Sequence, residues 1–380
     1  MKNGLRRVAL LCLTLATVTG TLAGCKRKEP VKLEAKGRIV VFAPEEASLR
    51  TEIDAARVLR SRFVDQSMLP LQHMTVAQMN SLRDYSAKAM EVMNGQKDKG
   101  TALQAAVFAP GFSGAAAAAV QVKRDFSGLP VAVCQPQGLA ASYSMSAALV
   151  LQYDDVAMAE AVTSASARLG AQALYYLTST RTVGYESTKV FLQTLQTACK
   201  ANGIQLHLQE VHDVLQDGKE TAQADITQVA ARALEQYGEG NFAVYASDRF
   251  ASEIVAVEVL KRHGILPGVG GGTPFEGIPA ALSVDMKGHE ADAAYALEQC
   301  KLLGESQGLN GNYALWQASL PALLLETAVR CVNNLEKGTV AAPEQVEAAF
   351  VAAKEALGVE ATLTRDETQA NLYRVSCALQ

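Results

Sequence analysis

Polar side chains with ligand-binding chemistry follow several of the apolar runs that are typical of strands. The candidates in the first half are Glu45, Phe112, Ser113 and Gln135, those in the second half are Asp154, Thr180, Arg181 and Asp248, and Thr273 follows a glycine-rich stretch. Carboxylates can bind hydroxyl groups or an amine, and an arginine can bind a carboxylate or a phosphate. Such groups would replace the water that a captured solute loses, because unpaired buried polar groups are costly. The pattern predicts a binding site for a small polar organic solute.

A helix N-cap or a solvated loop position is the alternative role for each of these residues. Asp154 and Asp248 each stand directly before a helical pattern, where a carboxylate commonly caps the first turn. The binding hypothesis therefore requires that Asp154, Arg181 and Asp248 line one cleft.

The sequence contains no convincing catalytic or metal-binding constellation. His207 and His212 are the closest histidine pair, and strand alternation turns His207 away from its apolar neighbours. The glycines of residues 268–272 lack the strand–GxGxxG–helix context and the lysine of a phosphate-binding loop. Residues 111–114, Gly-Phe-Ser-Gly, are not the GxSxG elbow of hydrolases. We therefore predict a binding protein and no enzyme, with no metal and no cofactor.

The stretch Ser146–Glu186 contains the elements that would position the candidates of the second half. An apolar run over Ala147–Tyr153 predicts a strand buried on both faces, and a helical pattern follows as far as Gly170. A second apolar run covers Ala173–Leu177. Strand, helix and strand in this order imply parallel pairing, and ligands bind beyond the carboxyl ends of such strands.

The same strand–helix alternation extends over the rest of the chain from Gly37. We expect two successive α/β halves, with parallel sheets flanked by helices. Among the further elements expected are helices over Leu49–Phe63 and Leu315–Leu335, strands over Leu71–Val76, Ala281–Val284 and Leu372–Leu379, and a polar loop over Gln209–Ala224. The glycine-rich residues 267–274 are expected to cross between the two halves.

The first 25 residues combine a basic start, a short apolar core and a terminal cysteine. Lys2, Arg6 and Arg7 precede the apolar run Val8–Val18, which is too short to span a bilayer comfortably. The following Leu-Ala-Gly-Cys, ending at Cys25, resembles the lipobox of bacterial lipoproteins. That resemblance implies a signal peptide over residues 1–24, a lipid on Cys25, and a tether over residues 25–36.

Composition limits the remaining possibilities. Loss of three basic residues with the leader lowers Lys and Arg from 35 to 32 against 39 acids, which gives a formal charge of −7. Such a charge argues against a nucleic-acid partner. The five cysteines beyond Cys25 are widely spaced and form no CxxC pair, so we expect small buried side chains. An oxidising compartment would permit a disulfide, but the sequence does not select a pair.

Two stretches carry a resemblance to a known family. LYYLTSTRTVGYESTKVFLQTLQTACKANGI and FAVYASDRFASEIVAVEVLKRHGI each combine a strand, a polar turn, a helix and a glycine stop. With the lipobox and the doubled α/β pattern, the chain resembles the type I periplasmic substrate-binding proteins of ABC transporters. Within that group it is most similar to an uncharacterised set of bacterial lipoproteins.

The resemblance implies two Rossmann-like lobes that close on a solute. The implied N-terminal lobe comprises residues 37–146 plus about 275–357, and the C-terminal lobe comprises residues 147–274 plus about 358–380. It also implies an ABC permease as partner and a lipid-anchored protein on the cell membrane that faces the periplasm or the cell exterior. The alternatives are a ligand-sensing lipoprotein that presents its ligand to a receptor, and an extracytoplasmic α/β enzyme. A cytoplasmic repressor is disfavoured, because no helix-turn-helix pattern precedes Gly37.

Overall fold

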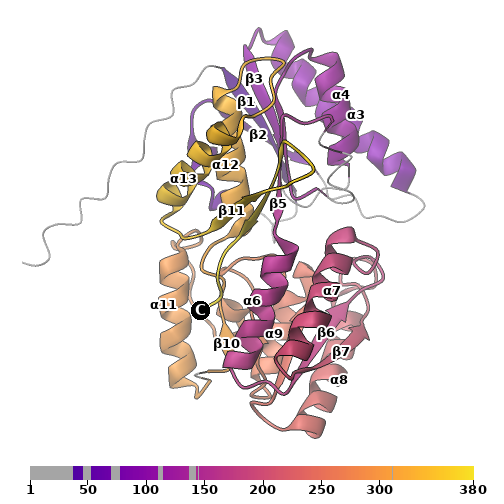
Figure 1. Cartoon of the computed structure of the whole chain (residues 1–380). Helices are drawn as coiled ribbons and strands as arrows, with labels where there is room; N and C mark the ends of the chain where they lie inside the picture. The colour runs from indigo at the N-terminus through magenta and orange to yellow at the C-terminus, as the bar shows by residue number, and fades with distance from the viewer. Residues whose placement is uncertain are drawn as a thin grey trace, which may run out of the picture. The chain divides into compact units, whose positions relative to one another are not determined.

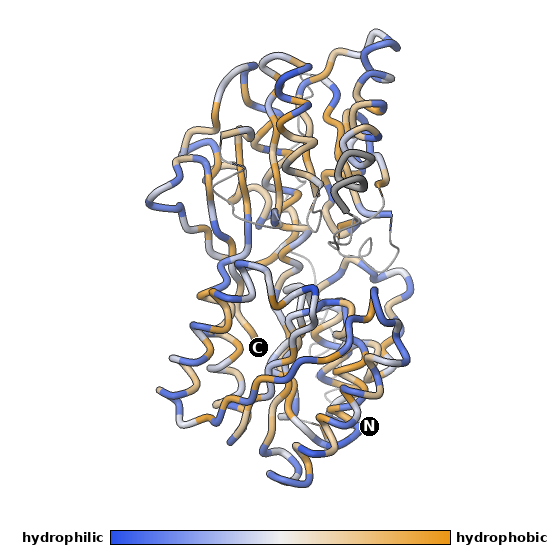
Figure 2. The backbone as a smooth tube through the Cα atoms, turned by 90° about the vertical axis from the view of Figure 1, so that its right-hand side faces the viewer, coloured by the Kyte–Doolittle hydropathy of each residue, from blue (hydrophilic) through white to orange (hydrophobic). Residues whose placement is uncertain are grey.

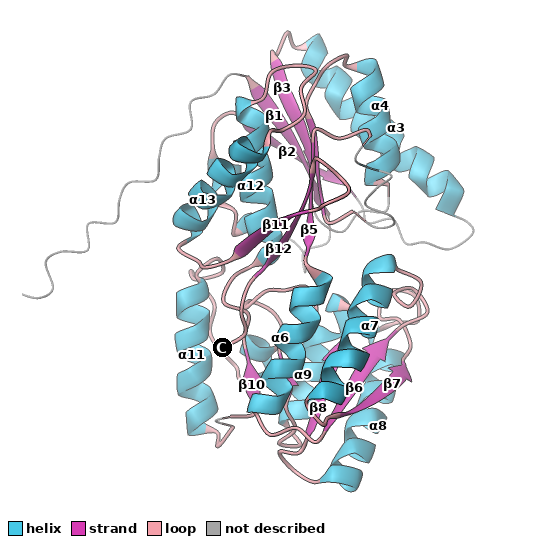
Figure 3. Cartoon of the chain, viewed as in Figure 1, coloured by secondary structure: helices cyan, strands magenta, loops and turns pink. Residues whose placement is uncertain are grey.

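Two separate parallel sheets organise the computed structural model, which describes residues 37–45, 53–69, 78–109, 114–136, 143, 145–309 and 311–380. The signal peptide, the tether, Cys25, Phe112, Ser113 and the expected strand over residues 71–76 lie outside the described residues. The sheet topology confirms the predicted α/β class (Figure 1, Figure 3).

The first sheet has seven strands in the order β11-β12-β5-β4-β3-β1-β2. Its strands are β1 (Arg38–Pro44), β2 (Val64–Leu69), β3 (Leu103–Phe108), β4 (Val131–Cys134), β5 (Leu149–Tyr153), β11 (Thr362–Arg365) and β12 (Leu372–Ser376). Neighbouring strands pair in parallel, except the antiparallel pair of β11 with β12. β1, β3, β4 and β5 are almost entirely buried, because helices cover both faces of a parallel sheet.

Helices from two parts of the chain cover this first sheet. They are α3 (Gln78–Asp98), α4 (Ala115–Asp125), α12 (Leu320–Asn334) and α13 (Pro343–Leu357). α12 packs on β3, β4 and β5 and is buried along nearly its whole length, while α4 packs on β3 and β4. The short 3-10 helix η1 (Arg57–Arg60) is fixed to α12, because the backbone N–H of Val58 donates to Glu326 Oε2 at 2.8 Å.

The second sheet has the order β7-β6-β8, with all strands parallel. It consists of β6 (Ala173–Thr178), β7 (Gln205–Glu210) and β8 (Phe242–Ala246). A bridge between Ala243 and Ile265 brings β9 (Leu266–Pro267) alongside β8, and β9 pairs with β10 (Tyr313–Ala314). The helices in this part of the chain are α6 (Asp155–Arg168), α7 (Glu186–Ala201), α8 (Lys219–Tyr237), η2 (Arg249–Ala251), α9 (Ser252–Leu260), α10 (Ile278–Ala281) and α11 (Ala293–Ser306). Figure 2 shows hydrophobic and hydrophilic residues interspersed along the backbone, as expected for helices that pack one face on a sheet.

Three stretches of chain connect the part built on the first sheet with the part built on the second. β5 leads directly into α6, residues 315–319 lead from β10 to α12, and residues 377–380 follow β12. The last two stretches pair with each other, since the N–H of Leu315 donates to the Gln380 carbonyl at 2.8 Å. Trp316, fully buried, donates from Nε1 to the Val269 carbonyl at 2.9 Å. The glycine-rich residues 267–274 therefore pack against a crossing but are not themselves the crossing that we expected.

Sheet membership differs from the predicted grouping of the chain. β5 was grouped with the second half and β11 and β12 with the C-terminal lobe, but all three belong to the seven-stranded sheet. We expected α10 and α11 in the N-terminal lobe. In the chain they lie between β9 and β10, and these two strands pair with each other. The physical reason is that β12 pairs with β5, a long-range hydrogen-bonded ladder that local patterns do not encode.

Some local expectations were also wrong. The strand expected at Ala281–Val284 is the end of α10 and a turn, because Gly277 with φ +68° and Pro279 start a helical turn. The described part of the expected helix Leu49–Phe63 ends in η1, and β2 follows directly. The loop expected at Gln209–Ala224 already contains the first turns of α8, and the helix expected from Leu315 begins at Leu320.

Candidate functional site

Arg181 lies between two carboxylates at the carboxyl ends of the second sheet. Its Nε is 2.9 Å from Asp213 Oδ2, and its Nη2 is 2.7 Å from Asp248 Oδ2. The side chains of Arg181, Asp213 and Asp248 are 7%, 0% and 6% exposed. Arg181 follows β6, Asp213 follows β7 and Asp248 follows β8, so the parallel topology brings together residues that are far apart in the sequence.

Asp213 is the fixed centre of this cluster. Its Oδ2 accepts a hydrogen bond from Ser179 Oγ at 2.7 Å and one from Arg181 Nε. Its Oδ1 accepts from the backbone N–H groups of Leu215 and Gln216 at 2.9 and 3.2 Å. Both carboxylate oxygens are therefore used within the protein, and Asp213 acts to position Arg181.

Asp248 and Arg181 face each other across a close ion pair. Asp248 Oδ1 caps η2 by accepting from the Phe250 N–H at 3.1 Å. Asp248 Oδ2 is 2.7 Å from Arg181 Nη2, and both atoms are buried. The pair therefore joins the end of β6 to the end of β8.

Burial and charge shift the pKa values of this cluster. Burial raises the pKa of Asp248 above its ordinary value, although Arg181 opposes that change, and Asp213 adds to it. For Arg181, burial acts to lower the pKa, but the carboxylates of Asp248 and Asp213 outweigh it, so its pKa is raised. Burial also raises the pKa of Tyr185, whose hydroxyl is 3.5 Å from Arg181 Nη1. The cluster consists of two carboxylates and one guanidinium.

Arg249 and Glu276 form a second ion pair beside this cluster, at 3.6 Å. Burial lowers the pKa of Arg249 and raises that of Glu276, which means that both charges lie largely out of water. Gly270 permits this packing, because a Cβ at that position would lie 2.7 Å from the Ala246 carbonyl oxygen. Each of these two arginines at the ends of the second sheet thus has a carboxylate partner.

The candidates near β4 and β5 make contacts within the protein. Gln135 has φ 43°, and its Oε1 accepts from the Tyr153 N–H at 2.7 Å. Asp154 caps α6 by accepting from the Ala157 N–H at 3.1 Å. Asp155, which follows it, has a pKa raised to about 7 by burial and by the neighbouring Asp154. The capping alternative therefore describes Asp154.

The other described candidates lie as follows. Glu45 is exposed directly after β1, and Thr180 is exposed beside Arg181. Thr273 is fully buried, and its Oγ1 accepts from the Phe275 N–H at 3.3 Å. The structure brings Arg181 and Asp248 together, and no contact joins Asp154 to them. Asp213 was missed, although it stands just after an alternating strand as the other candidates do, because the segment was interpreted as loop.

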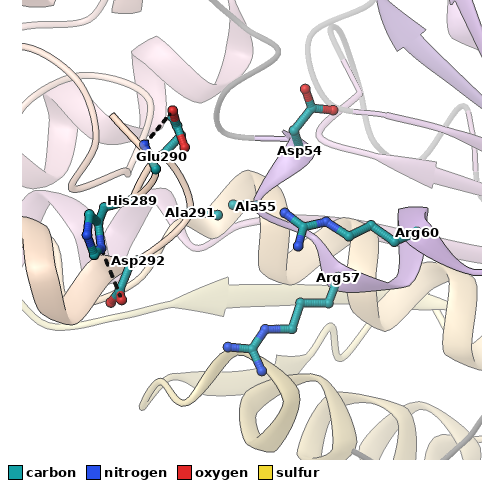
Figure 4. A pocket seen from close by; sticks show the side chains of 9 residues that line it. Asp54, Ala55, Arg57, Arg60, His289, Glu290, Ala291 and Asp292 are labelled. Atoms are coloured by element: carbon teal, nitrogen blue, oxygen red, sulfur yellow. Dashed lines mark hydrogen bonds and ion pairs between the residues drawn. The ribbon is translucent and has the colours of Figure 1, made fainter. Parts of the chain in front are cut away.

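A groove of about 450 Å³ lies elsewhere in the fold (Figure 4). It lies between η1 with the residues before it and the loop before α11, and none of the described candidates lines it. Figure 4 shows Arg57 and Arg60 on one wall and His289, Glu290 and Asp292 on the other. Arg57 and Arg60 are exposed, and neither forms an ion pair with a described residue.

Metal and disulfide chemistry concern the histidine, cysteine and acidic side chains of the described residues. There, no group of three or more His, Cys, Asp or Glu side chains is placed to hold a metal ion. The five cysteines that the structure describes, Cys134, Cys199, Cys300, Cys331 and Cys377, are buried free thiols. Among the same residues, no helix combines the length and apolar character needed to cross a membrane.

Comparisons with known proteins identify a family and a fold. The family model described as "Protein of unknown function (DUF3798)" matches residues 52–312, more than half of the chain. No curated protein matches the sequence. The structure is similar to that of a "Putative transcriptional regulator" from Clostridium difficile 630, with a TM-score of 0.70, 12% identity, and coverage of 92% of this chain and 99% of that chain.

Solute-binding proteins of ABC transporters are also among the similar solved structures. One is from Clostridium phytofermentas with bound L-rhamnose, with a TM-score of 0.49, 12% identity, and coverage of 91% of this chain and 96% of that chain. Another is the arabinose-transporter component from Shewanella sp. ANA-3, with a TM-score of 0.46, 14% identity, and coverage of 90% and 91%. At such identities the likeness concerns the fold alone.

Proposed function

The chain belongs to the family described as "Protein of unknown function (DUF3798)", and from that premise we propose that it is an extracytoplasmic solute-binding lipoprotein. It captures a small polar organic solute between two lobes and delivers it to the permease of an ABC importer. Binding and lobe closure carry out this function without bond chemistry.

The observation that carries the proposal is the Arg181–Asp248 pair. It lies at the carboxyl ends of parallel strands, where open α/β folds bind ligands. It supplies a guanidinium and a carboxylate, the groups that hold the polar atoms of a solute. Thr180, exposed beside Arg181, gives a solute a further hydroxyl contact.

The proposed lobes follow the two sheets. One lobe is built on the seven-stranded sheet and the other on β6, β7 and β8, and the three connecting stretches form the hinge. The pairing of Leu315 with Gln380 and the bridge between Trp316 and Leu379 hold two of these stretches together. A hinge of paired strands allows rotation of the lobes while each sheet stays intact.

Solute binding is tested on the mature protein purified under native conditions. Native mass spectrometry is expected to detect a co-purified small molecule, and its re-addition to stripped protein is expected to raise the melting temperature with concentration, as linkage requires. Small-angle scattering is expected to show a smaller radius of gyration with the solute bound. Absence of any bound compound, together with no stabilisation by a broad solute library, would overturn the proposal. Chemical turnover of the bound compound would instead support an enzyme.

The lipid anchor is tested separately. Cells grown with labelled palmitate are expected to incorporate the label into the wild-type chain, and Cys25→Ser is expected to abolish both labelling and membrane association. Cys12→Ser, inside the proposed leader, is the matched control and is expected to leave labelling unchanged. Equal labelling of the wild type and Cys25→Ser would contradict the anchor.

A further inference from the structure

The first sheet is rich in basic side chains at the end where its parallel strands begin. β1 to β5 all pair in parallel, so the residues at or just before the start of each strand gather at one end. The loop 336–340 joins them, because the Gly338 N–H donates to the Gly128 carbonyl at 2.6 Å. We call this surface the basic end. Its charged residues are the cations Arg38, Arg62, Lys97, Lys99, Lys123, Arg124 and Lys337 and the acids Asp65, Asp98, Asp125 and Glu336.

The basic end differs in charge from the chain as a whole. Seven cations and four acids lie there, although the chain without its first 24 residues has a formal charge of −7. Arg38 is paired with Asp65 at 3.2 Å, and Arg124 is paired with Asp125 at 2.6 Å. The other five cations and two acids are all exposed. The basic end is therefore a positive surface that is open to an anionic partner.

Two exposed apolar side chains lie among these charges. Met145, just before β5, is 82% exposed, and Val340 is 53% exposed. Lys123 Nζ donates to the Met145 carbonyl at 2.8 Å, and the Ala341 N–H donates to the Ala148 carbonyl at 3.1 Å, so both apolar residues adjoin the basic ones. Basic side chains with exposed apolar side chains among them suit the headgroup region of a bilayer.

The lipid anchor of the proposed function would join the fold at this same end. Residue 37 directly precedes β1, and only residues 26–36 separate it from Cys25. A chain of that length spans at most about 40 Å even when it is fully extended. Residues 26–36 also contain five basic and two acidic side chains. A lipid on Cys25 would therefore hold the basic end close to the membrane.

We propose that the basic end is a membrane-contacting surface that binds the anionic phospholipids of the bilayer to which the chain is anchored. This inference rests on the lipid anchor of the proposed function and adds a second contact with the membrane. Anionic headgroups attract the Lys and Arg side chains, while Met145 and Val340 reach the apolar boundary. The surface ends toward β11 and β12, where Glu344 and Glu367 are exposed. The contact points the carboxyl ends of β1 to β5 away from the lipid.

The test uses the mature chain with Cys25→Ser, which cannot carry the lipid and so isolates the protein surface. Its binding to vesicles of phosphatidylcholine, alone or mixed with phosphatidylglycerol, is measured by co-sedimentation. We expect binding to the mixed vesicles, release by salt, and at least about tenfold weaker binding to pure phosphatidylcholine.

Charge reversal on the basic end is compared with an equal reversal elsewhere. The two triple variants are Lys97→Glu, Lys99→Glu, Lys337→Glu on the basic end and Lys200→Glu, Lys261→Glu, Lys301→Glu at exposed positions of the part built on the second sheet. We expect the first to bind mixed vesicles at least about tenfold more weakly and the second to stay within about threefold of the unreversed chain. Circular dichroism and melting temperature verify the fold of both.

An environment-sensitive dye tests which side of the protein touches the lipid. On Met145→Cys its emission is expected to shift to the blue with mixed vesicles, whereas on Leu302→Cys, an equally apolar and exposed position of α11, it should not. A shift at Leu302 alone, equal binding of the two triple variants, binding without phosphatidylglycerol, or no binding at all would overturn the membrane-contacting surface. The anchor and the solute site would then still stand, because palmitate labelling and solute binding test them separately.

Discussion

Two arginine sites of this protein differ in almost every physical respect. Arg181 is nearly buried and lies between two carboxylates at 2.9 and 2.7 Å. Arg57 and Arg60 are exposed on the wall of an open groove of about 450 Å³, opposite Glu290 and Asp292. The groove has the space, whereas the Arg181 cluster has buried charges that are fixed by ion pairs and hydrogen bonds.

The comparison teaches that an opening does not identify a binding site. Water screens exposed charges, so the groove can offer only weak electrostatic interactions. In the cluster, Asp213 has already fixed the guanidinium, so a ligand would not have to order it. The following predictions test that contrast, from the largest expected effect to the smallest.

Removal of Asp213 should have the largest effect. Asp213→Ala leaves the Arg181 guanidinium with one carboxylate fewer and removes four hydrogen bonds. We expect a loss of about 3–5 kcal/mol in the free energy of unfolding, measured by urea denaturation. Asp225→Ala, whose pair with His212 is more exposed, is expected to lose less than about 1 kcal/mol. Equal losses in the two variants would contradict the contrast between buried and exposed pairs.

Asp155 should make stability depend on pH. Its folded pKa of about 7 lies above the ordinary value, so the folded state holds this proton more tightly than the unfolded state does. The stabilising contribution is therefore complete below about pH 4 and is lost as the pH rises through about 7. Asp154, Arg374 and the phenols of Tyr153, Tyr176 and Tyr245 are the charged and titratable groups that interact with Asp155.

Asp155→Asn is expected to remove this dependence. The wild type should lose about 3–4 kcal/mol in the free energy of unfolding from pH 4 to pH 8, and Asp155→Asn should not show this loss. Urea denaturation at each pH measures it. Glu160→Gln, an exposed change on the same helix, leaves Asp155 in place and should keep the wild-type decline. A parallel decline in Asp155→Asn and the wild type would show that another group is responsible.

Trp316→Phe should have a smaller effect. The substitution removes the hydrogen bond from Nε1 to the Val269 carbonyl, inside a buried contact between a connecting stretch and the glycine-rich residues 267–274. We expect a loss of about 1–2 kcal/mol in the free energy of unfolding, measured by thermal denaturation. Tyr295→Phe, which removes a more exposed hydrogen bond to the Asp285 carbonyl, is the control and should lose less than about 0.5 kcal/mol.

The groove arginines should have the smallest effect. Arg57→Ala and Arg60→Ala remove exposed charges without an ion-pair partner among the described residues, so each is expected to change stability by less than about 0.5 kcal/mol. Neither should change the stabilisation by a solute in the thermal-shift assay. A loss of solute binding in either variant would transfer the binding site from the Arg181 cluster to the groove.

Much of the fold follows from local patterns in the sequence. The apolar runs of β5, β6 and β8 and the helical spacing of α6 and α7 were sufficient to predict the parallel α/β class. Strand-end reasoning also selected Arg181 and Asp248, because polar residues that follow parallel strands share one edge of a sheet. The same reasoning failed for Asp213, whose segment appeared polar and loop-like.

By itself, the sequence determined the strand cores, most helices and the charge types at the strand ends, because each depends on neighbouring residues. Only the tertiary structure decided that β12 pairs with β5, that Ile278–Ala281 is helical, and that Asp213 joins Arg181 and Asp248. These outcomes depend on contacts between distant segments, whose energies no local pattern contains. The pairing of one guanidinium with two carboxylates in the Arg181 cluster likewise emerges only from those contacts.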